Sequence, residues 1–227
     1  MLGVLGGMGP AATVDFLDKF VALTPAIRDQ EHLPVLVNFA PQIPDRSAAI
    51  LGNGPSPLPA MQRALHILVA GGVRAIAIPC NTSHHWHEEL QAGCPVPILH
   101  IADAVAQAVS QQTDLYPVMI LATRGTLQSG FYQRRLDSQH QPWCLPKPDE
   151  QIEVDRVIAL VKAGGAPEAS KILEALWERW SGRTGRLIFA CTELPIAAAT
   201  LGTSPFKLFD SNHELAHHCI DFCLAQR

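Results

Sequence analysis

The stretches IAIPC at Ile76–Cys80 and LIFAC at Leu187–Cys191 decide how the rest of the sequence is interpreted. Both are short apolar runs that end in a cysteine, and they lie roughly half the chain apart. A short apolar run bounded by Gly, Pro or the start of a helix is typical of a buried strand. The two runs therefore predict two related halves, although residue identity between the halves is low.

Working outward from these stretches, short apolar runs alternate with longer helical patterns along the chain. We predict buried strands at Leu2–Gly6, Pro34–Ala40, Val73–Pro79, Val118–Ala122 and Arg186–Ala190, with weaker candidates at Pro97–His100 and Phe206–Phe209. We predict helices at Leu58–Ala70 and Asp149–Ala163, and near 10–23, 84–91, 102–111, 129–139, 167–180, 193–200 and 211–225. This alternation predicts an α/β protein with largely parallel sheets.

The composition excludes several classes of protein. The 227 residues are 48% hydrophobic and 17% charged, which is unlike a mainly disordered chain. A net charge of −4 with scattered basic residues indicates no nucleic-acid surface, and no apolar run is long enough to span a bilayer. The N-terminal stretch lacks the pattern of a secretory signal. Six cysteines without a CxxC pair are too few for a disulfide scaffold, so we expect a cytoplasmic protein.

Cys80 and Cys191 are the most informative residues. Each is expected where a strand passes into a helix, and ligands bind at that end of the strands in open α/β sheets. A helix N-terminus favours a thiolate and lowers the cysteine pKa. Asn81, Thr82 and Thr192 are placed to cap these helices, and the backbone N–H groups to hold an anion.

Another interpretation is that both cysteines are small buried apolar residues at strand ends. Their matching positions in the two halves favour the functional interpretation. The other four cysteines lack this setting, and we interpret them as structural: Cys94, Cys144, Cys219 and Cys223.

Three segments resemble the signature segments of the aspartate/glutamate racemase family, in the same order and over essentially the whole chain. They are Gly3–Pro10, Pro79–His84 and Ala190–Pro195. The resemblance implies two α/β domains related by a pseudo-twofold axis, with one active site in the cleft between them and no pyridoxal phosphate or metal. We place the first domain at residues 1–98 plus 208–227 and the second at 99–207, the C-terminal helix returning to the first domain.

Two departures point to one branch of that family. Glutamate racemases carry an acidic residue in the first glycine-rich turn and a histidine after the second Cys-Thr pair. Here Gly6-Gly7-Met8 contains no acid, and Glu193 follows Thr192. Both features resemble the aspartate-racemase-like branch, which includes broad-specificity amino-acid racemases.

Racemisation explains why two cysteines would be needed. A proton must leave one face of the α-carbon and another must arrive on the opposite face, so two bases are the simplest arrangement, one a thiolate and the other a thiol. Backbone N–H groups aimed at the α-carboxylate would stabilise the developing carbanion. By resemblance, Cys80 acts on the D-enantiomer and Cys191 on the L-enantiomer.

An acidic substrate also requires positive charge at its side-chain end. In the branch that this chain resembles, an arginine after Pro-Asp and a lysine before Ala-Gly bind the distal carboxylate, and Arg46 and Lys162 match them. The alternatives are a loop arginine paired with Asp45 and a lysine that interacts with the helix dipole.

The remaining candidates are weaker. Met8 and Gly9 lie in the glycine-rich turn, which does not fit GxGxxG and is better interpreted as a substrate-binding turn. Thr123 ends a strand of the second half and, with Glu193, completes the expected substrate site. The closely spaced His84, His85 and His87 have no thiolate or acidic ligand at metal-site spacing, so we expect no metal.

The sequence therefore predicts a cofactor-independent racemase for aspartate, glutamate or both, acting as a homodimer on a small-molecule substrate, without nucleic-acid or membrane partners. Other carbanion-type reactions on the same scaffold remain open: maleate isomerisation, hydantoin racemisation and arylmalonate decarboxylation. A dicarboxylate-binding protein without turnover is a further alternative. A thiol–disulfide enzyme is disfavoured, because neither cysteine has a close resolving partner.

Overall fold

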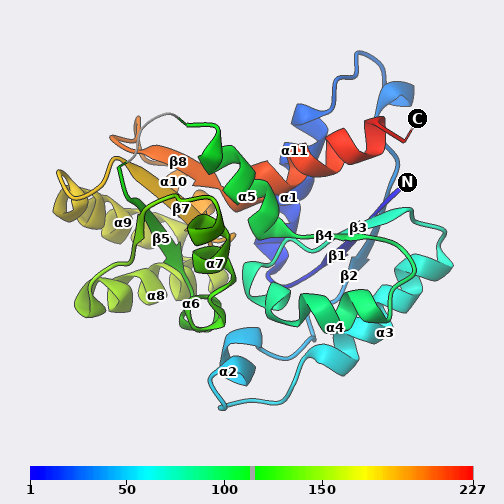
Figure 1. Cartoon of the computed structure of the whole chain (residues 1–227), viewed down its shortest axis with the longest axis horizontal. Coiled ribbons are helices and arrows are strands. Elements are labelled where there is room, and N and C mark those ends of the chain that lie inside the picture. Colours follow the sequence, from blue (N-terminus) through cyan, green and yellow to red (C-terminus); the bar gives the residue numbers. More distant parts are fainter. Residues whose placement is uncertain (113–115, 227) are drawn as a thin grey trace.

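The computed structural model describes residues 1–112 and 116–226 and contains two parallel four-stranded sheets (Figure 1). The first has the order β2-β1-β3-β4, built from β1 (Leu2–Gly6), β2 (Val35–Phe39), β3 (Ala75–Ala77) and β4 (Ile98–Leu99). The second has the order β6-β5-β7-β8, built from β5 (Val118–Ala122), β6 (Trp143–Cys144), β7 (Arg186–Ala190) and β8 (Lys207–Asp210). The equal strand order confirms the predicted α/β fold with two similar parallel-sheet halves.

The helices connect successive strands and cover the sheets. The first half contains α1 (Pro10–Leu23), the 3₁₀ turn η1 (Asp29–Glu31), α2 (Arg46–Ile50), α3 (Leu58–Ala70), the 3₁₀ helix η2 (Asn81–Trp86) and α4 (His87–Ala92). Next come α5 (Ile101–Ser110), α6 (Arg124–Ser129), α7 (Phe131–Ser138), α8 (Pro148–Lys162), α9 (Ala166–Trp180), α10 (Leu194–Ala198) and α11 (Ser211–Leu224).

Several predicted boundaries were wrong for local reasons. The helix expected at 129–139 is α7, which begins only at Phe131 because Gly130 adopts a left-handed conformation (φ 68°), and the preceding α6 was not predicted. The helix expected at 84–91 divides into η2 and α4. The strand expected at Val73–Pro79 pairs only over Ala75–Ala77. Neither α2 nor β6 was predicted, since five and two residues carry almost no periodicity.

The central strands β1, β3, β5 and β7 are buried on both faces, as parallel strands require. In the first sheet Leu5 and Ile76 face the cluster beneath α3, whereas Leu2 and Val4 face α1 and α11. In the second sheet Leu121 packs toward α8 and α9, and Ile120 toward α5 and α7. This alternation along each strand leaves the strand ends as the places where polar side chains can gather.

The C-terminal helix α11 packs against both α1 and α5. Asn212 at its start donates hydrogen bonds to the Ala12 carbonyl (2.9 Å) and to Asp15 (2.7 Å) of α1. The helix therefore joins the end of the second sheet to the first half. The domain limits drawn from the sequence stay a prediction. Within the described ranges, no helix has the length and apolar character needed to cross a bilayer.

Candidate active site

One buried cavity gathers residues from the corresponding strand ends of the two sheets. Cys80 lies beyond the end of β3 and Cys191 directly follows β7, which hold the same position in their sheets. The lining residues are Met8, Asp45, Arg46, Ser47, Cys80, Asn81, Thr82, Thr123, Lys162, Cys191, Thr192 and Glu193. Every residue predicted for the site is among them except Gly9. A Cβ at Gly9 would lie 2.9 Å from Oε1 of Glu193, so Gly9 allows the glycine-rich turn to approach that carboxylate.

The segment after Cys80 is held against the end of its strand by short-range hydrogen bonds. The Ser83 hydroxyl donates to the Cys80 carbonyl (2.6 Å), and Nε2 of His84 donates to the Ile78 carbonyl (3.1 Å). Cys80 itself is buried and precedes the first residue of η2. Its thiol is therefore carried on a fixed turn.

The predicted capping roles of Asn81, Thr82 and Thr192 were wrong, because these side chains bond elsewhere. The Asn81 amide donates to the Ser211 hydroxyl (2.8 Å) and accepts from the Tyr132 hydroxyl (2.5 Å). Both ends of this amide are thus bonded to residues of α11 and α7. Asn81 ties η2 to the second half of the molecule.

Three threonine hydroxyls meet where the two halves face one another. Thr82 lies 3.0 Å from the hydroxyl of Thr123 and 2.9 Å from that of Thr126. Thr123 also caps α6 by accepting from the Thr126 backbone N–H (3.2 Å). The predicted strand-end position of Thr123 therefore brings it to the same point as Thr82, whereas nothing in the sequence singled out Thr126.

Cys191 has a different electrostatic environment from the one expected at a helix N-terminus. Its thiol donates to Oε2 of Glu193 (3.1 Å), and both residues are buried. Burial raises the pKa of Cys191 well above its usual value, the Glu193 carboxylate raises it further, and Lys162 opposes both. The predicted lowering of this pKa was wrong, because burial and the Glu193 carboxylate dominate, and α10 begins only at Leu194.

Arg46 is not a solvated loop arginine. It begins α2 and is only 9% exposed, donating to the carbonyls of Ile43 (3.1 Å), Pro44 (3.1 Å) and Met8 (3.3 Å). Asp45 does not pair with it; its carboxylate caps α2 through the Ala48 N–H (2.7 Å). The Arg46 guanidinium is therefore fixed at the cavity wall.

Lys162 ends α8 and lines the cavity, although the residue as a whole is exposed. Partial burial opposes its charge, but the neighbouring Cys191, Glu193 and Cys80 outweigh that effect and raise the pKa of Lys162. Two cations, two thiols and two carboxylates (Asp45 and Glu193) thus line a small volume. Such a site suits proton transfer at a carbon atom of an anionic substrate.

The cavity is closed on one side by a contact between α2 and α6. The Gly125 N–H donates to the Ser47 hydroxyl (3.1 Å), and the Gln128 side chain donates to the Ile50 carbonyl (3.5 Å). The enclosed volume is only about 20 Å³. Sequence reasoning missed Asp45 and Ser47; the available signal was the Asp-Arg-Ser order, in which an aspartate precedes a helix as its cap.

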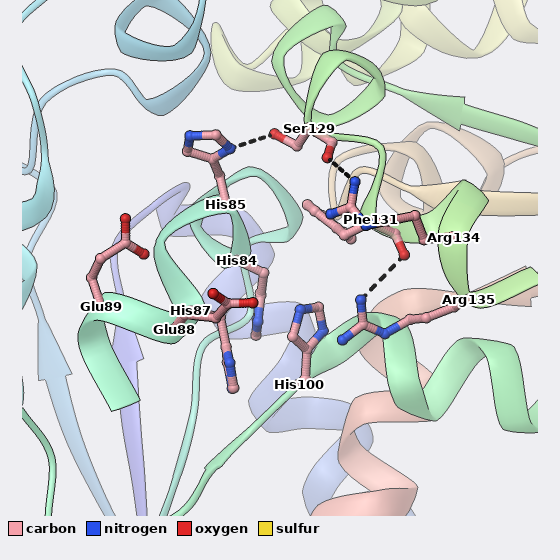
Figure 2. Close-up of a pocket in the computed structure, with 10 residues that line it drawn as sticks. All are labelled: His84, His85, His87, Glu88, Glu89, His100, Ser129, Phe131, Arg134 and Arg135. Atoms are coloured by element: carbon pink, nitrogen blue, oxygen red, sulfur yellow. Dashed lines mark hydrogen bonds between the residues drawn. The ribbon is translucent and has the colours of Figure 1, made fainter. Parts of the chain in front are cut away.

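The other residues considered from the sequence lie outside this cavity. All six cysteines are free, and the four interpreted as structural are absent from its lining. His84, His85 and His87 line a second cavity (Figure 2). In the part of the chain that the structure describes, no group of three His, Cys, Asp or Glu side chains is arranged to hold a metal ion.

Comparison with known proteins gives concordant matches. The sequence model of the Asp/Glu/Hydantoin racemase family matches residues 5–219. A broad-specificity amino-acid racemase of Bacillus subtilis is 29% identical over 234 residues, covering 99% of each chain. A glutamate racemase of Deinococcus radiodurans is 30% identical over 165 residues, which are 69% of this chain and 55% of that protein.

Solved structures show the same fold. The aspartate racemase of Picrophilus torridus superposes with a TM-score of 0.88 at 29% identity, covering 98% of this chain and 93% of the other. A glutamate racemase of Francisella tularensis, solved with D-glutamate, has a TM-score of 0.71 at 16% identity over 99% of this chain and 81% of its own. At that identity the second match supports the fold alone.

Proposed function

The chain belongs to the Asp/Glu/Hydantoin racemase family, and we propose that it interconverts the L- and D-forms of aspartate, glutamate or both, without a cofactor. The observation that carries this proposal is the pair Cys80 and Cys191. They follow corresponding strands of two similar sheets and line one buried cavity. A base on each side of a bound α-carbon is the arrangement that racemisation requires.

In the direction from L to D, the Cys191 thiolate takes the α-proton, so that a C–H bond breaks and an S–H bond forms. The electron pair passes into the α-carboxylate, and the Cys80 thiol then delivers its proton to the opposite face of the carbon. The enzyme is left with a Cys191 thiol and a Cys80 thiolate, which is the state that the reverse reaction needs. The assignment of each cysteine to one enantiomer follows the family resemblance.

The remaining side chains stabilise charge. Arg46 and Lys162 supply the positive charge for the distal carboxylate of an acidic amino acid. The Thr82 and Thr123 hydroxyls and the backbone N–H groups after each cysteine supply donors for the α-carboxylate. Lys162 also favours the Cys191 thiolate, because it opposes the effect of burial and of Glu193 on the pKa of that thiol.

The enclosed volume indicates that binding includes a change in the distance between the halves. A cavity of about 10–15 Å³ holds one water molecule, so about 20 Å³ is too small for an amino acid. The contact between α2 and α6 must open for the substrate to enter and close again around it. Closure excludes water and so strengthens the electrostatic stabilisation of the carbanion.

A homodimer in a reducing cytoplasm completes the proposal. Six free cysteines are the usual state in that compartment. Val14 and Val21, both more than half exposed, lie two turns apart on α1 and offer apolar surface for a subunit contact.

The test follows solvent deuterium. The protein is incubated in D₂O with L- and D-aspartate and L- and D-glutamate, and loss of the α-proton signal is measured by NMR. Cys80→Ala should still exchange the α-proton of the L-enantiomer without racemising it, and Cys191→Ala should do so with the D-enantiomer. Cys94→Ala, outside the site, serves as the matched control. If no amino acid exchanges its α-proton, the racemase proposal is wrong and a binding protein becomes the better interpretation.

A second reaction class is separable in the same way. A hydantoin or aryl substrate lacks the distal carboxylate that Arg46 and Lys162 would bind. If the protein exchanges the proton of a hydantoin but not the α-proton of aspartate or glutamate, the proposed substrate class is wrong. The two cysteines would remain the proposed bases.

A further inference from the structure

A second cavity, of about 300 Å³, lies between the two halves and has no part in the chemistry proposed above. One wall is formed by η2 and α4, and the other by the end of α6 and the start of α7, with His100 at the start of α5 (Figure 2). It shares no lining residue with the cleft that holds Cys80 and Cys191. Its volume lies at the lower end of the range for small-molecule pockets.

His84 presents a buried hydrogen-bond acceptor in this cavity wall. The residue is 3% exposed, and burial lowers its pKa to about 3, so that the ring is neutral at physiological pH. Because Nε2 donates to the Ile78 carbonyl, Nδ1 carries the lone pair. Among the residues that the structure describes, this Nδ1 has no hydrogen-bond partner. A buried acceptor without a partner is costly, and this atom has less than 1 Å² of exposed surface, so a ligand donor reaches it only if the His84 ring turns.

His100 presents a donor beside it. Its Nδ1 accepts from the Ala102 N–H (3.1 Å), and burial, with the nearby His84 and Arg135, lowers its pKa, so the neutral ring carries its proton on Nε2. The His100 ring lies 4.5 Å from the His84 ring, centroid to centroid, and packs edge-on to Phe131 at 5.4 Å. The wall thus combines an aromatic surface with the fixed Nε2–H donor of His100.

The two sides of the cavity carry opposite charges. Figure 2 shows Glu88 and Glu89 on one side, Arg134 and Arg135 on the other, and the rings of His84 and His100 between them. Arg134 donates to the Ser129 carbonyl (3.0 Å), and Arg135 pairs with Asp103 and donates to the Phe131 carbonyl (3.2 Å).

Both arginines keep further N–H groups with no partner in residues 1–112 and 116–226, and neither glutamate forms an ion pair there. A simple anion would be repelled by the glutamates, and a simple cation would be repelled by the arginines. Only a ligand that carries both a positive and a negative charge finds an oppositely charged partner on each side of the cavity.

We propose that this cavity binds a small zwitterion of the α-amino acid class. Its carboxylate faces Arg134, Arg135 and the Nε2–H of His100, and its ammonium group faces Glu88 and Glu89. The aromatic surface of Phe131 accommodates the aliphatic part of the ligand. The site goes beyond the racemase reaction and does not depend on it.

The ligand would rest on an element that also forms the catalytic cleft. The helix η2 contributes His84 to this cavity, while its first residues, Asn81 and Thr82, line the cleft. A ligand bound in this cavity therefore contacts the same 3₁₀ helix that follows Cys80 in the catalytic cleft.

Glycine is a suitable probe because it is achiral, so racemisation leaves it unchanged. Protein labelled in its histidine rings is titrated with glycine, with N-acetylglycine, which lacks the ammonium group, and with glycinamide, which lacks the carboxylate. No histidine lines the catalytic cleft, whereas His84, His85, His87 and His100 line this cavity, so the ring signals of these four residues report it. We expect saturable shifts of the His84 and His100 ring signals with glycine, and binding at least about tenfold weaker with either derivative.

Charge-removing variants locate the binding. Arg134 and Glu88 are exposed, so Arg134→Gln and Glu88→Gln should fold normally, and each should weaken glycine binding about tenfold. The matched controls are Arg63→Gln and Glu178→Gln, which remove exposed charges elsewhere and should leave the affinity unchanged. The proposal is overturned if glycine causes no saturable shift, if both derivatives bind as well as glycine, or if neither cavity variant weakens binding.

Discussion

Replacing Gly125 by alanine should hold the catalytic cleft open. Gly125 lies in the first turn of α6, where an added Cβ would come within 2.8 Å of the Ser47 hydroxyl oxygen and 2.9 Å of the Ser47 Cα on α2. Both distances are well below an ordinary van der Waals contact. Because the Ser47 Cα belongs to the backbone, rotation of a side chain does not relieve the clash. The two helices must therefore move apart, and the hydrogen bond between them is lost.

The expected magnitude follows from the cost of such overpacking, typically 1–3 kcal/mol. Applied to closure of the cleft, this lowers the population of the closed form by roughly 5- to 150-fold, since 1.4 kcal/mol is a factor of ten. If reaction requires the closed form, kcat/KM falls by the same factor in both directions. Within an isolated helix, alanine is more favourable than glycine by about 1 kcal/mol, so helix propensity works against this loss.

The assay is the initial rate of racemisation from each enantiomer, followed by circular dichroism together with the melting temperature. Gly202→Ala is the matched control, because a Cβ there meets no atom within 4 Å. Adding Ser47→Gly, which removes the side chain that the new Cβ meets, should restore part of the activity. A Gly125→Ala variant that keeps kcat/KM within about twofold of the wild type would refute the closing role of the α2–α6 contact.

Three further predictions concern charged side chains that line the cleft. Glu193→Gln removes the carboxylate that raises the pKa of Cys191, so the thiolate should form at lower pH. The acid limb of the L-to-D pH–rate profile then moves to lower pH, and alkylation of Cys191 by iodoacetamide at neutral pH becomes faster; an unmoved limb would show that Glu193 does not control this thiol. Lys162→Met should have the opposite effect, because Lys162 lowers the pKa of Cys191. The acid limb of the L-to-D pH–rate profile should then move to higher pH. Arg46→Lys loses the fork geometry of the guanidinium, and a lost charge-assisted hydrogen bond costs ~1.5–3 kcal/mol. Turnover of aspartate or glutamate should then fall about 10- to 150-fold while that of alanine, if it is a substrate, stays nearly unchanged; an equal fall for both would show that Arg46 does not recognise the side chain.

The sequence was most informative where burial alone decides the structure. The strands at Leu2–Gly6, Val118–Ala122 and Arg186–Ala190 were predicted with their observed limits, because continuous apolar runs have few alternatives to a buried strand. Since equivalent strands end at equivalent places, Cys80 and Cys191 could be assigned to one cavity before their surroundings were known.

Sequence reasoning failed where a contact with a distant part of the chain decides the outcome. Neither the bonding of Asn81 to Tyr132 and Ser211 nor the burial of Cys191 beside Glu193 can be derived from helix-capping and dipole arguments. Local propensity predicted a capping asparagine and a lowered cysteine pKa, and tertiary packing reversed both. Ser47 was missed because α2 is too short to show a period.

The path of the backbone between the two sheets has a mechanical consequence. The chain leaves the first half from β4 into α5 and returns to it from β8 into α11, and α5 and α11 pack against each other. Two covalent crossings side by side resist twisting of one half relative to the other, and they leave bending about a line through both crossings as the easy motion. Each cycle of opening then follows nearly the same arc, and the two sulfur atoms return to the same mutual position. Under the proposed two-cysteine mechanism, the stereochemical fidelity of proton delivery then depends on two helices, α5 and α11, that contribute no residue to the lining of the cleft.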